Sequence, residues 1–277
     1  MKSLKLLITG GAGYIGSHMV KHAQEHGHEV IVLDDFSTGH MWAIKNCEII
    51  NINLLDKDRL SKVLSGRYFD GVIHFAAKSL VPESIQKPFL YYQNNVTGTL
   101  NLLDEMIKND INNIVFSSTA AIFGNPIEDK ISENHPKIPI NAYGKSKLII
   151  EGILNDISRI HNINIICFRY FNAAGAHESG EIGEAHDPET HLIPNILNSL
   201  LKNNISLKVF GNDYPTIDGT CIRDYIHVSD LAHAHLLGIQ FIQNNKGFFE
   251  FNLGNGQGYS ILDIIDSCND VTGSNLD

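Results

Sequence analysis

Short apolar runs alternate with longer amphipathic stretches along the chain as far as Tyr170. The apolar runs are typical of strands buried in a parallel sheet, and the amphipathic stretches are typical of helices that cover it. The runs predict strands at residues 4–9, 29–33, 48–51, 69–75, 113–118 and 163–169. The stretches between them predict helices at residues 17–26, 56–64, 88–107 and 141–160. This alternation predicts an α/β fold with a doubly wound parallel sheet.

The pattern changes after Tyr170. A polar loop at residues 177–191 is too long to be a plain connector between two elements. Beyond it we expect helices at 192–202, 228–243 and 260–271, and short strands at 207–210 and 248–253. The chain therefore divides into a sheet domain, residues 1–172, and a smaller C-terminal substrate lobe, residues 173–277. Some elements of this lobe are expected to return to the first domain.

Composition and charge argue against several classes of partner. Apolar residues make up 43% of the chain and charged residues 19%, the balance of an ordinary soluble protein. The formal net charge of −10 argues against a nucleic-acid backbone or an anionic membrane surface as the main partner. No apolar run approaches the roughly 18 residues of a membrane span. Because the start of the chain leads directly into a strand, no signal peptide is expected either.

Cysteine and histidine spacing gives no sign of a metal site. The four cysteines, Cys47, Cys167, Cys221 and Cys268, are far apart and form no Cys-x-x-Cys pair. This spacing argues against a zinc site or a disulfide framework and favours reduced thiols in a cytoplasmic protein. The 14 histidines show no metal-ligand spacing, so we interpret most of them as surface or packing residues.

A glycine-rich turn at residues 10–16 joins the first predicted strand to the first predicted helix. Its glycines would let the backbone approach a pyrophosphate at the positive helix N-terminus, and Gly16 would let the helix pack closely on the strand. The next strand ends at Asp34, whose carboxylate would bind the adenosine ribose hydroxyls and repel a 2′-phosphate. The alternative is a tight structural turn. The context on both sides favours a Rossmann domain that binds NAD rather than NADP.

Three polar residues in later elements are candidates for acid–base chemistry. Thr119 follows the strand at 113–118, at the edge where open parallel sheets bind their ligands. Tyr143 and Lys147 are four apart on a predicted helix that Asn141 would cap, so they lie on the same face. A nearby ammonium would lower the pKa of the phenol from about 10 and let it take a proton from a sugar hydroxyl. For this spacing alone, the alternative is a solvated helix face.

Together these motifs resemble the extended short-chain dehydrogenase/reductases, and within them the UDP-glucose 4-epimerases, over essentially the whole chain. The segment at 9–16, the set of Thr119, Tyr143 and Lys147, and residues 169–172 all fit that family. The most specific segment is 211–228, which runs from Gly-Asn-Asp-Tyr-Pro-Thr to Arg-Asp-Tyr-Ile-His-Val. The resemblance implies NAD as cofactor, a UDP-hexose as substrate and a homodimer.

The resemblance also implies two sets of ligand-binding residues. NAD would contact Gly10, Gly13, Tyr14, Ile15, Gly16, Asp34, Asp35, Phe36, Ser37, Thr38, Gly39, Asn53, Leu54, Phe75, Ala76, Ala77, Asn94, Tyr143, Lys147 and Phe171. The nucleotide sugar would contact Thr119, Asn172, His191, Leu192, Lys208, Val209, Phe210 and Arg223. The Arg223 guanidinium suits a diphosphate, with a surface ion pair as the alternative. Asn172 could bind a phosphate or a sugar hydroxyl, or only hold a turn.

The implied reaction inverts sugar C4 without net oxidation, through a 4-keto intermediate. Tyr143 would remove the C4 hydroxyl proton, Lys147 would depress the pKa of the phenol and orient the nicotinamide ribose, and Thr119 would bond the C4 oxygen. The dehydratases of the superfamily carry an acidic pair just after this threonine. Because Ala120 and Ala121 stand there in this chain, dehydration is not expected.

The chain departs from the family pattern in a few places. Thr119 stands where many epimerases have serine, Phe123 where tyrosine is common, and Ser79 where some members carry a lysine. Family members usually continue past Asp277, so the resemblance implies a substrate lobe that is incomplete at its C-terminus. The alternatives are another nucleotide-sugar epimerase or decarboxylase, a net NAD-dependent oxidoreductase, and a truncated, non-catalytic NAD-binding protein.

Overall fold

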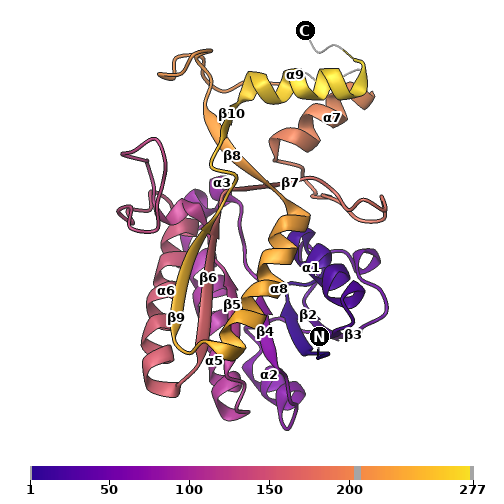
Figure 1. Ribbon diagram of the computed structural model, residues 1–277, viewed down its shortest axis with the longest axis vertical. Coiled ribbons are helices and arrows are strands. Elements are labelled where there is room, and N and C mark those ends of the chain that lie inside the picture. Colours follow the sequence, from indigo (N-terminus) through magenta and orange to yellow (C-terminus); the bar gives the residue numbers. More distant parts are fainter. Residues whose placement is uncertain (1, 203–206, 275–277) are drawn as a thin grey trace.

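The centre of the molecule is a parallel sheet with helices on both faces (Figure 1). A computed structural model describes residues 2–202 and 207–274. In this part of the chain the sheet has seven strands in the order β3-β2-β1-β4-β5-β6-β9. The strands are β1 (Lys5–Thr9), β2 (Glu29–Asp34), β3 (Glu48–Asn51), β4 (Gly71–His74), β5 (Asn113–Ser117), β6 (Asn164–Tyr170) and β9 (Phe248–Leu253). The predicted doubly wound sheet is confirmed.

The helices form two layers around this sheet and a third group above it (Figure 1). They are α1 (Tyr14–Glu25), α2 (Lys57–Leu64), α3 (Val81–Gln86), α4 (Pro88–Tyr91), α5 (Gly98–Lys108), α6 (Ala142–His161), α7 (Leu192–Lys202), α8 (Val228–Asn244) and α9 (Ile261–Thr272). A small second sheet has the order β10-β8-β7, with β7 at Asn172–Ala174, β8 at Ile222–His227 and β10 at Gly258–Ser260. Helices α7 and α9 lie beside it, at the top of Figure 1. None of the helices in the described chain is long and apolar enough to cross a membrane.

Two hydrophobic cores lie on opposite faces of the main sheet. Strand side chains alternate between the faces, so Leu7 belongs to one core while Leu6 and Ile8 belong to the other. The core that contains Leu7 is completed by side chains of α2, α5 and α6, and the other by side chains of α1 and α8. The strands are therefore buried on both sides, which explains why they are apolar throughout rather than alternating.

The predicted helix at 88–107 is present, and its hydrogen-bond pattern changes within it. A π-helical turn at Tyr92–Thr97 separates α4 from α5. On this turn the buried Asn95 accepts a hydrogen bond from the Lys78 N–H at 2.8 Å, and its amide donates to the Lys78 carbonyl at 3.0 Å and to Ser146 Oγ at 3.1 Å. Asn95 thus ties the segment after β4 to helix α6. π-Helical turns are frequent at functional sites, and the neighbouring Asn94 lines the pocket described below.

Segments distant in sequence complete the main sheet. Strand β9 pairs with β6 along its whole length, from Ile165–Phe248 to Tyr170–Leu253. Helix α8 packs on β5, β6 and α1. Residues 228–253 therefore lie with the first domain, although they follow the lobe in the sequence. The proposed boundary at residue 172 falls between β6, which belongs to the main sheet, and β7, which belongs to the small sheet of the lobe.

The predicted strand at 207–210 is wrong. Residues Leu207–Phe210 lie outside any strand, and Lys208, Val209 and Phe210 are exposed. A strand needs a neighbour to satisfy its backbone N–H and C=O groups, and no described strand pairs with this segment. Conversely, the sequence analysis missed α3, β7, β8 and β10. The three missed strands are only 3–6 residues long, too short for a clear periodicity.

Candidate active site

A large pocket opens at the carboxyl ends of the main strands, beneath the small sheet. Residues that follow β1, β2, β4 and β5 line one side of it, and residues of β7 and β8 line the other. It lies where the strand order reverses between β1 and β4, which is where open α/β sheets bind their ligands. Its volume of about 1320 Å³ exceeds the roughly 300–1,000 Å³ of sites for one drug-sized ligand. The pocket therefore has room for two nucleotides.

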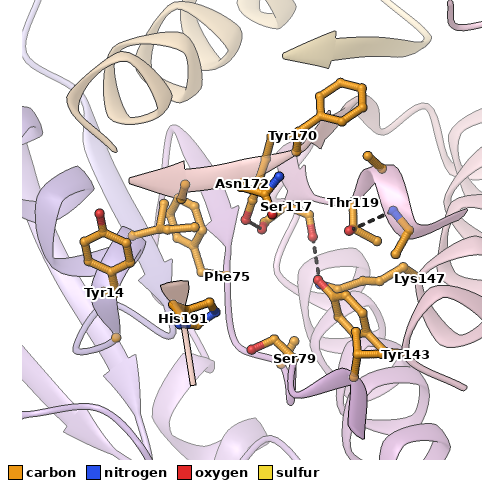
Figure 2. Close-up of a pocket in the computed structure, with 18 of the residues that line it drawn as sticks. Tyr14, Phe75, Ser79, Ser117, Thr119, Tyr143, Lys147, Tyr170, Asn172 and His191 are labelled. Carbon is orange, nitrogen blue, oxygen red and sulfur yellow. Dashed lines mark hydrogen bonds between the residues drawn. The ribbon is translucent and has the colours of Figure 1, made fainter. Parts of the chain in front are cut away.

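Most of the predicted site residues line this pocket. Figure 2 shows Thr119, Tyr143 and Lys147 grouped at one end and Tyr14 and Phe75 toward the other. The predicted residues that do not line it are Phe36, Leu192, Lys208, Val209 and Phe210. Phe36 misses the pocket because it packs against the core formed with α1 and α8. Residues 208–210 are exposed to solvent instead.

In the glycine turn, two glycines are required for close packing, and a third faces open space. A Cβ on Gly10 would lie 2.5 Å from the Ala76 nitrogen, and one on Gly16 would lie 2.1 Å from the Gly10 carbonyl oxygen, so both positions need glycine for packing. A Cβ on Gly13 would meet only the Gly10 carbonyl, at 3.4 Å. Gly13 begins helix α1 without any side-chain cap. The N-terminal N–H groups of α1 therefore face open pocket, which fits a pyrophosphate.

Asp34 lies at the end of β2 and holds the glycine turn in place. Its Oδ2 accepts a hydrogen bond from the Ala12 N–H at 2.9 Å, and its Oδ1 accepts one from the Phe36 N–H at 2.8 Å. Burial raises the pKa of this carboxyl, and the two backbone donors oppose that shift. Asp34 still lines the pocket. Its position fits the ribose-binding carboxylate of a dinucleotide site, and with the open helix start it makes the residues present compatible with NAD.

Tyr143 and Lys147 project from the first turns of helix α6. The predicted cap is confirmed, because Asn141 Oδ1 accepts from the Gly144 N–H at 2.8 Å. Lys147 is 2% exposed, and its Nζ donates to the Ser117 carbonyl at 2.7 Å and lies 4.7 Å from the centre of the Phe116 ring. Burial lowers the pKa of Lys147 to about 7. This lysine is thus anchored to the end of β5 beside the tyrosine.

Tyr143 and Thr119, the two predicted acid–base residues, both line the pocket. Burial raises the pKa of Tyr143, and the neighbouring Thr119 hydroxyl opposes that shift. The lowering that we expected from Lys147 is not seen in the protein alone. The physical reason is that the same burial destabilises both the phenolate and the ammonium. A positive charge brought in by a ligand is therefore needed to lower the pKa of the phenol.

Behind this site lies a buried ionic cluster that the sequence analysis missed. Arg169, at 0% exposure, donates from Nε to Glu151 Oε1 at 3.0 Å and from Nη2 to Glu151 Oε2 at 2.8 Å, and it also contacts Glu250. Ser118 Oγ donates to the same Glu151 at 2.6 Å. Glu151 lies one helical turn beyond Lys147, which was the only local signal. The cluster fixes helix α6 against β5, β6 and β9.

The lobe side of the pocket is more open. Asn172 donates to the Asp224 carbonyl at 2.8 Å, so it joins β7 to β8, and its side chain also lines the pocket. Arg223 is exposed, and its guanidinium bonds only the neighbouring Ile222 carbonyl, at 2.8 Å, among the interactions described. It is therefore available to a ligand. Tyr14 reaches across from the sheet domain and donates to the Gly175 carbonyl at 2.6 Å.

Comparisons with known proteins agree with this arrangement. The NAD dependent epimerase/dehydratase family matches residues 6–254. The chain is 47% identical over 270 residues to a UDP-glucose 4-epimerase of Halalkalibacterium halodurans, with 98% of this chain and 81% of that protein covered. It is 44% identical over 274 residues to a UDP-glucose 4-epimerase of Lactobacillus helveticus, with 99% and 83% covered.

Solved structures resemble the whole described fold. A UDP-glucose 4-epimerase from Brucella ovis in complex with NAD superposes with a TM-score of 0.93 at 43% identity, covering 97% of this chain and 82% of that one. The enzyme from Bifidobacterium longum in complex with NAD+ and UDP superposes with a TM-score of 0.92 at 37% identity, covering 98% and 84%. The chain belongs to the NAD-dependent epimerase/dehydratase family.

Proposed function

We propose that this protein interconverts UDP-galactose and UDP-glucose by reversible oxidation at sugar C4. One observation carries the proposal: Tyr143, one helical turn from Lys147, lines the same pocket as Thr119, the glycine turn and Asp34. The relatives at 41–47% identity are UDP-glucose 4-epimerases. Bound NAD would supply a hydride acceptor and donor next to C4.

The proton chemistry falls to the residues at the end of β5. Tyr143 takes the C4 hydroxyl proton on one face of the sugar and returns it on the other. Thr119, which lines the same pocket, would exchange hydrogen bonds with the same sugar oxygen and so guide the proton. Lys147 is held in place by its hydrogen bond to the Ser117 carbonyl. From there its ammonium would orient the nicotinamide ribose.

The surroundings of Thr119 favour epimerisation over dehydration. Ala120 and Ala121 line the pocket directly after this threonine. Elimination of a sugar hydroxyl needs an acid to protonate the leaving group, and methyl groups cannot supply one. An intermediate ketone would therefore keep its other hydroxyls until the proton returns.

The lobe side would hold the nucleotide sugar. Arg223 would bind the diphosphate through its guanidinium, and Asn172 would bond a phosphate or a sugar hydroxyl. Because Arg223 lies on β8 and Asn172 on the neighbouring β7, both stand opposite Tyr143 and can hold the diphosphate while the sugar turns. His191 would contribute to the same wall.

We further propose a cytoplasmic homodimer. All four cysteines are free, as expected in a reducing compartment. Exposed apolar side chains lie on α3 to α6, namely Ile85, Phe89, Leu100 and Ile149. Phe89 is 77% exposed, which is unusual for a ring of that size on a monomer surface. Size-exclusion chromatography with light scattering checks this, and a single-chain mass at micromolar concentration would contradict it.

A single assay separates the proposed function from its alternatives. The protein is incubated with UDP-galactose without added NAD, and UDP-glucose and free NADH are measured. UDP-glucose without NADH release supports the epimerase. Stoichiometric NADH would instead indicate a net oxidoreductase, and retained NAD without product would indicate a non-catalytic protein.

A further inference from the structure

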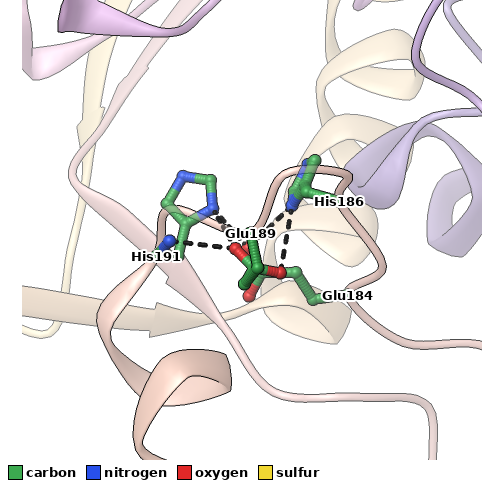
Figure 3. A group of neighbouring side chains, drawn as sticks. All are labelled: Glu184, His186, Glu189 and His191. Atoms are coloured by element: carbon green, nitrogen blue, oxygen red, sulfur yellow. Dashed lines mark hydrogen bonds and ion pairs between the residues drawn. The ribbon is translucent and has the colours of Figure 1, made fainter. Parts of the chain in front are cut away.

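The loop between β7 and α7 gathers four side chains that the sequence did not place together: Glu184, His186, Glu189 and His191. One possible ligand atom from each lies within 4.8 Å of all the others. Figure 3 shows the two imidazole rings on opposite sides of the carboxylates, with the nitrogens facing the oxygens between them. This loop was predicted to be too long for a plain connector, and the cluster accounts for its compact path.

The separations within the cluster match a metal coordination shell. His186 Nδ1 lies 3.2 Å from Glu184 Oε1 and 3.7 Å from Glu189 Oε2. His191 Nδ1 lies 2.6 Å from Glu184 Oε1 and 3.4 Å from Glu189 Oε1. Ligand atoms bound to tetrahedral zinc at roughly 2.0–2.2 Å are about 3.3 Å from one another. Three of these four nitrogen–oxygen separations are close to that value. The two to Glu189 run to different oxygens and the His191–Glu184 separation is shorter, so a shared ion requires side-chain rotations at these residues.

The polar atoms of the cluster lie close together, but one of them makes no hydrogen bond within the described chain. His186 Nδ1 is buried and has no partner in hydrogen-bond geometry within the described chain, although Glu184 is close. A donor near an acceptor but not aimed at it is unusual inside a protein, where buried polar atoms are paired. Such an orientation is expected for two ligands that point toward the same cation.

The cluster also carries negative charge that no lysine or arginine of the described chain pairs with. The side chains of Glu184 and Glu189 are only 9% and 12% exposed, and their ion-pair partners within the described residues are the two imidazoles. The Thr190 and His191 N–H groups donate to Glu189 at 2.8 and 2.9 Å. Two carboxylates this close to one another are costly to bury without a full compensating charge.

We propose that Glu184, His186, Glu189 and His191 bind one divalent transition-metal ion, of which Zn²⁺ fits best. Two imidazole nitrogens and two carboxylate oxygens in a compact group are a donor set that zinc takes in four-coordinate sites. Imidazole ligands disfavour Mg²⁺ and Ca²⁺, which prefer oxygen. The competing arrangement is an ion pair in which protonated His191 faces Glu184, and that carboxylate indeed raises the pKa of His191.

The site lies on the wall of the pocket, so a bound ion would act on ligands there. This role rests on the proposed function. Glu184, His186 and His191 line the pocket, and the His186 ring lies 6.3 Å from the ring of Tyr14 beside the glycine turn. Two ligands that each carry a diphosphate would meet carboxylates on this wall. A divalent ion would reverse the sign of the local charge and fix the loop that forms the wall.

Metal binding is tested without reference to catalysis. The full chain is stripped with a chelator and titrated with Zn²⁺ alone by calorimetry, with bound metal counted by mass spectrometry, and Co²⁺ serves as a visible-absorption probe of the coordination geometry. The variants are the double substitution His186→Ala/His191→Ala and the isosteric pair Glu184→Gln/Glu189→Gln. His22→Ala is the matched control, because His22 belongs to a separate surface group with His26 and His233.

We expect one Zn²⁺ per chain, a loss of affinity of at least about 100-fold in both double variants, and no change in His22→Ala. Circular dichroism establishes that each variant is folded. The proposal is overturned if the parent chain binds no Zn²⁺ up to about 1 mM, or if both double variants bind it as the parent does. Loss of binding in His22→Ala alone would likewise assign the ion to the surface histidines and overturn it. Because the readout is metal content, an inactive enzyme does not affect the result.

Discussion

The two sides of the pocket are built differently. Thr119, Tyr143 and Lys147 stand on the end of a central strand and on a helix held by the buried Arg169–Glu151–Glu250 cluster. The lobe wall consists of a loop and short strands. Arg223, on that wall, is exposed, and its guanidinium bonds only the neighbouring Ile222 carbonyl among residues 2–202 and 207–274. The residues proposed for proton transfer therefore lie on the rigid part of the fold, whereas the surface that would admit the ligand is formed largely by a loop and short strands.

The largest expected effect is on the rigid side. Tyr143→Phe removes the phenol hydroxyl that we propose as the acid–base group while keeping the ring in the pocket. We expect kcat for UDP-galactose to fall at least about 10³-fold, because general acid–base groups contribute in that range. Bound NAD, measured after denaturation, should stay at the parent level. Turnover within a few-fold of the parent would refute the assignment of the proton to this residue.

The next effect is on stability. Arg169→Met leaves the buried Glu151 and the partly buried Glu250 without their main cation, and we expect the free energy of unfolding to fall by about 3–4 kcal/mol. Lys137→Met is the matched control, because that lysine, 29% exposed, pairs with Glu250 from the rim and should cost less than about 1 kcal/mol. Urea denaturation measures both. Equal losses of stability in the two variants would mean that the buried Arg169–Glu151 pair does not hold helix α6 in place.

A smaller effect is expected on the lobe wall. Arg223→Ala removes the exposed guanidinium proposed to bind the diphosphate, and we expect KM for UDP-galactose to rise about 10-fold, since a charged hydrogen bond contributes about 1.5 kcal/mol. Because this residue is far from the proton chemistry in our proposal, kcat should change little. Steady-state kinetics separate the two constants. A fall in kcat with an unchanged KM would contradict the division between the two sides.

The smallest effect is a pH dependence on the rigid side. Burial lowers the pKa of Lys147 to about 7, so above that pH the unfolded chain binds more protons than the folded one and stability rises with pH. Between pH 7 and pH 8 this lysine should add about 1 kcal/mol to the free energy of unfolding. The free energy of unfolding is measured at both pH values for the parent and for Lys147→Met. In the variant the increase in stability with pH should disappear. The same slope in both proteins would show that the lysine is charged in the fold throughout this range.

The amino-acid pattern was enough to predict the elements and motifs that depend on neighbours in the chain. The six apolar runs up to residue 169 became strands of one parallel sheet, and the glycine turn, Asp34 and the Asn141 cap took their places as predicted. Each of these depends on periodicity, on backbone freedom or on a hydrogen bond within a few residues. Thr119 and Tyr143 were also placed at one site, because strand ends and helix starts meet at the same edge of such a sheet.

The remaining features depend on how distant segments fold together. The tertiary structure put β9 beside β6, closed Arg169 onto Glu151 and Glu250, left residues 207–210 without a strand partner, and brought His186 and His191 onto two glutamates. It also reversed the expected pKa shift of Tyr143 by burying the site. These outcomes depend on contacts between segments far apart in the chain and on the loss of water around them, and neither leaves a local pattern in the sequence.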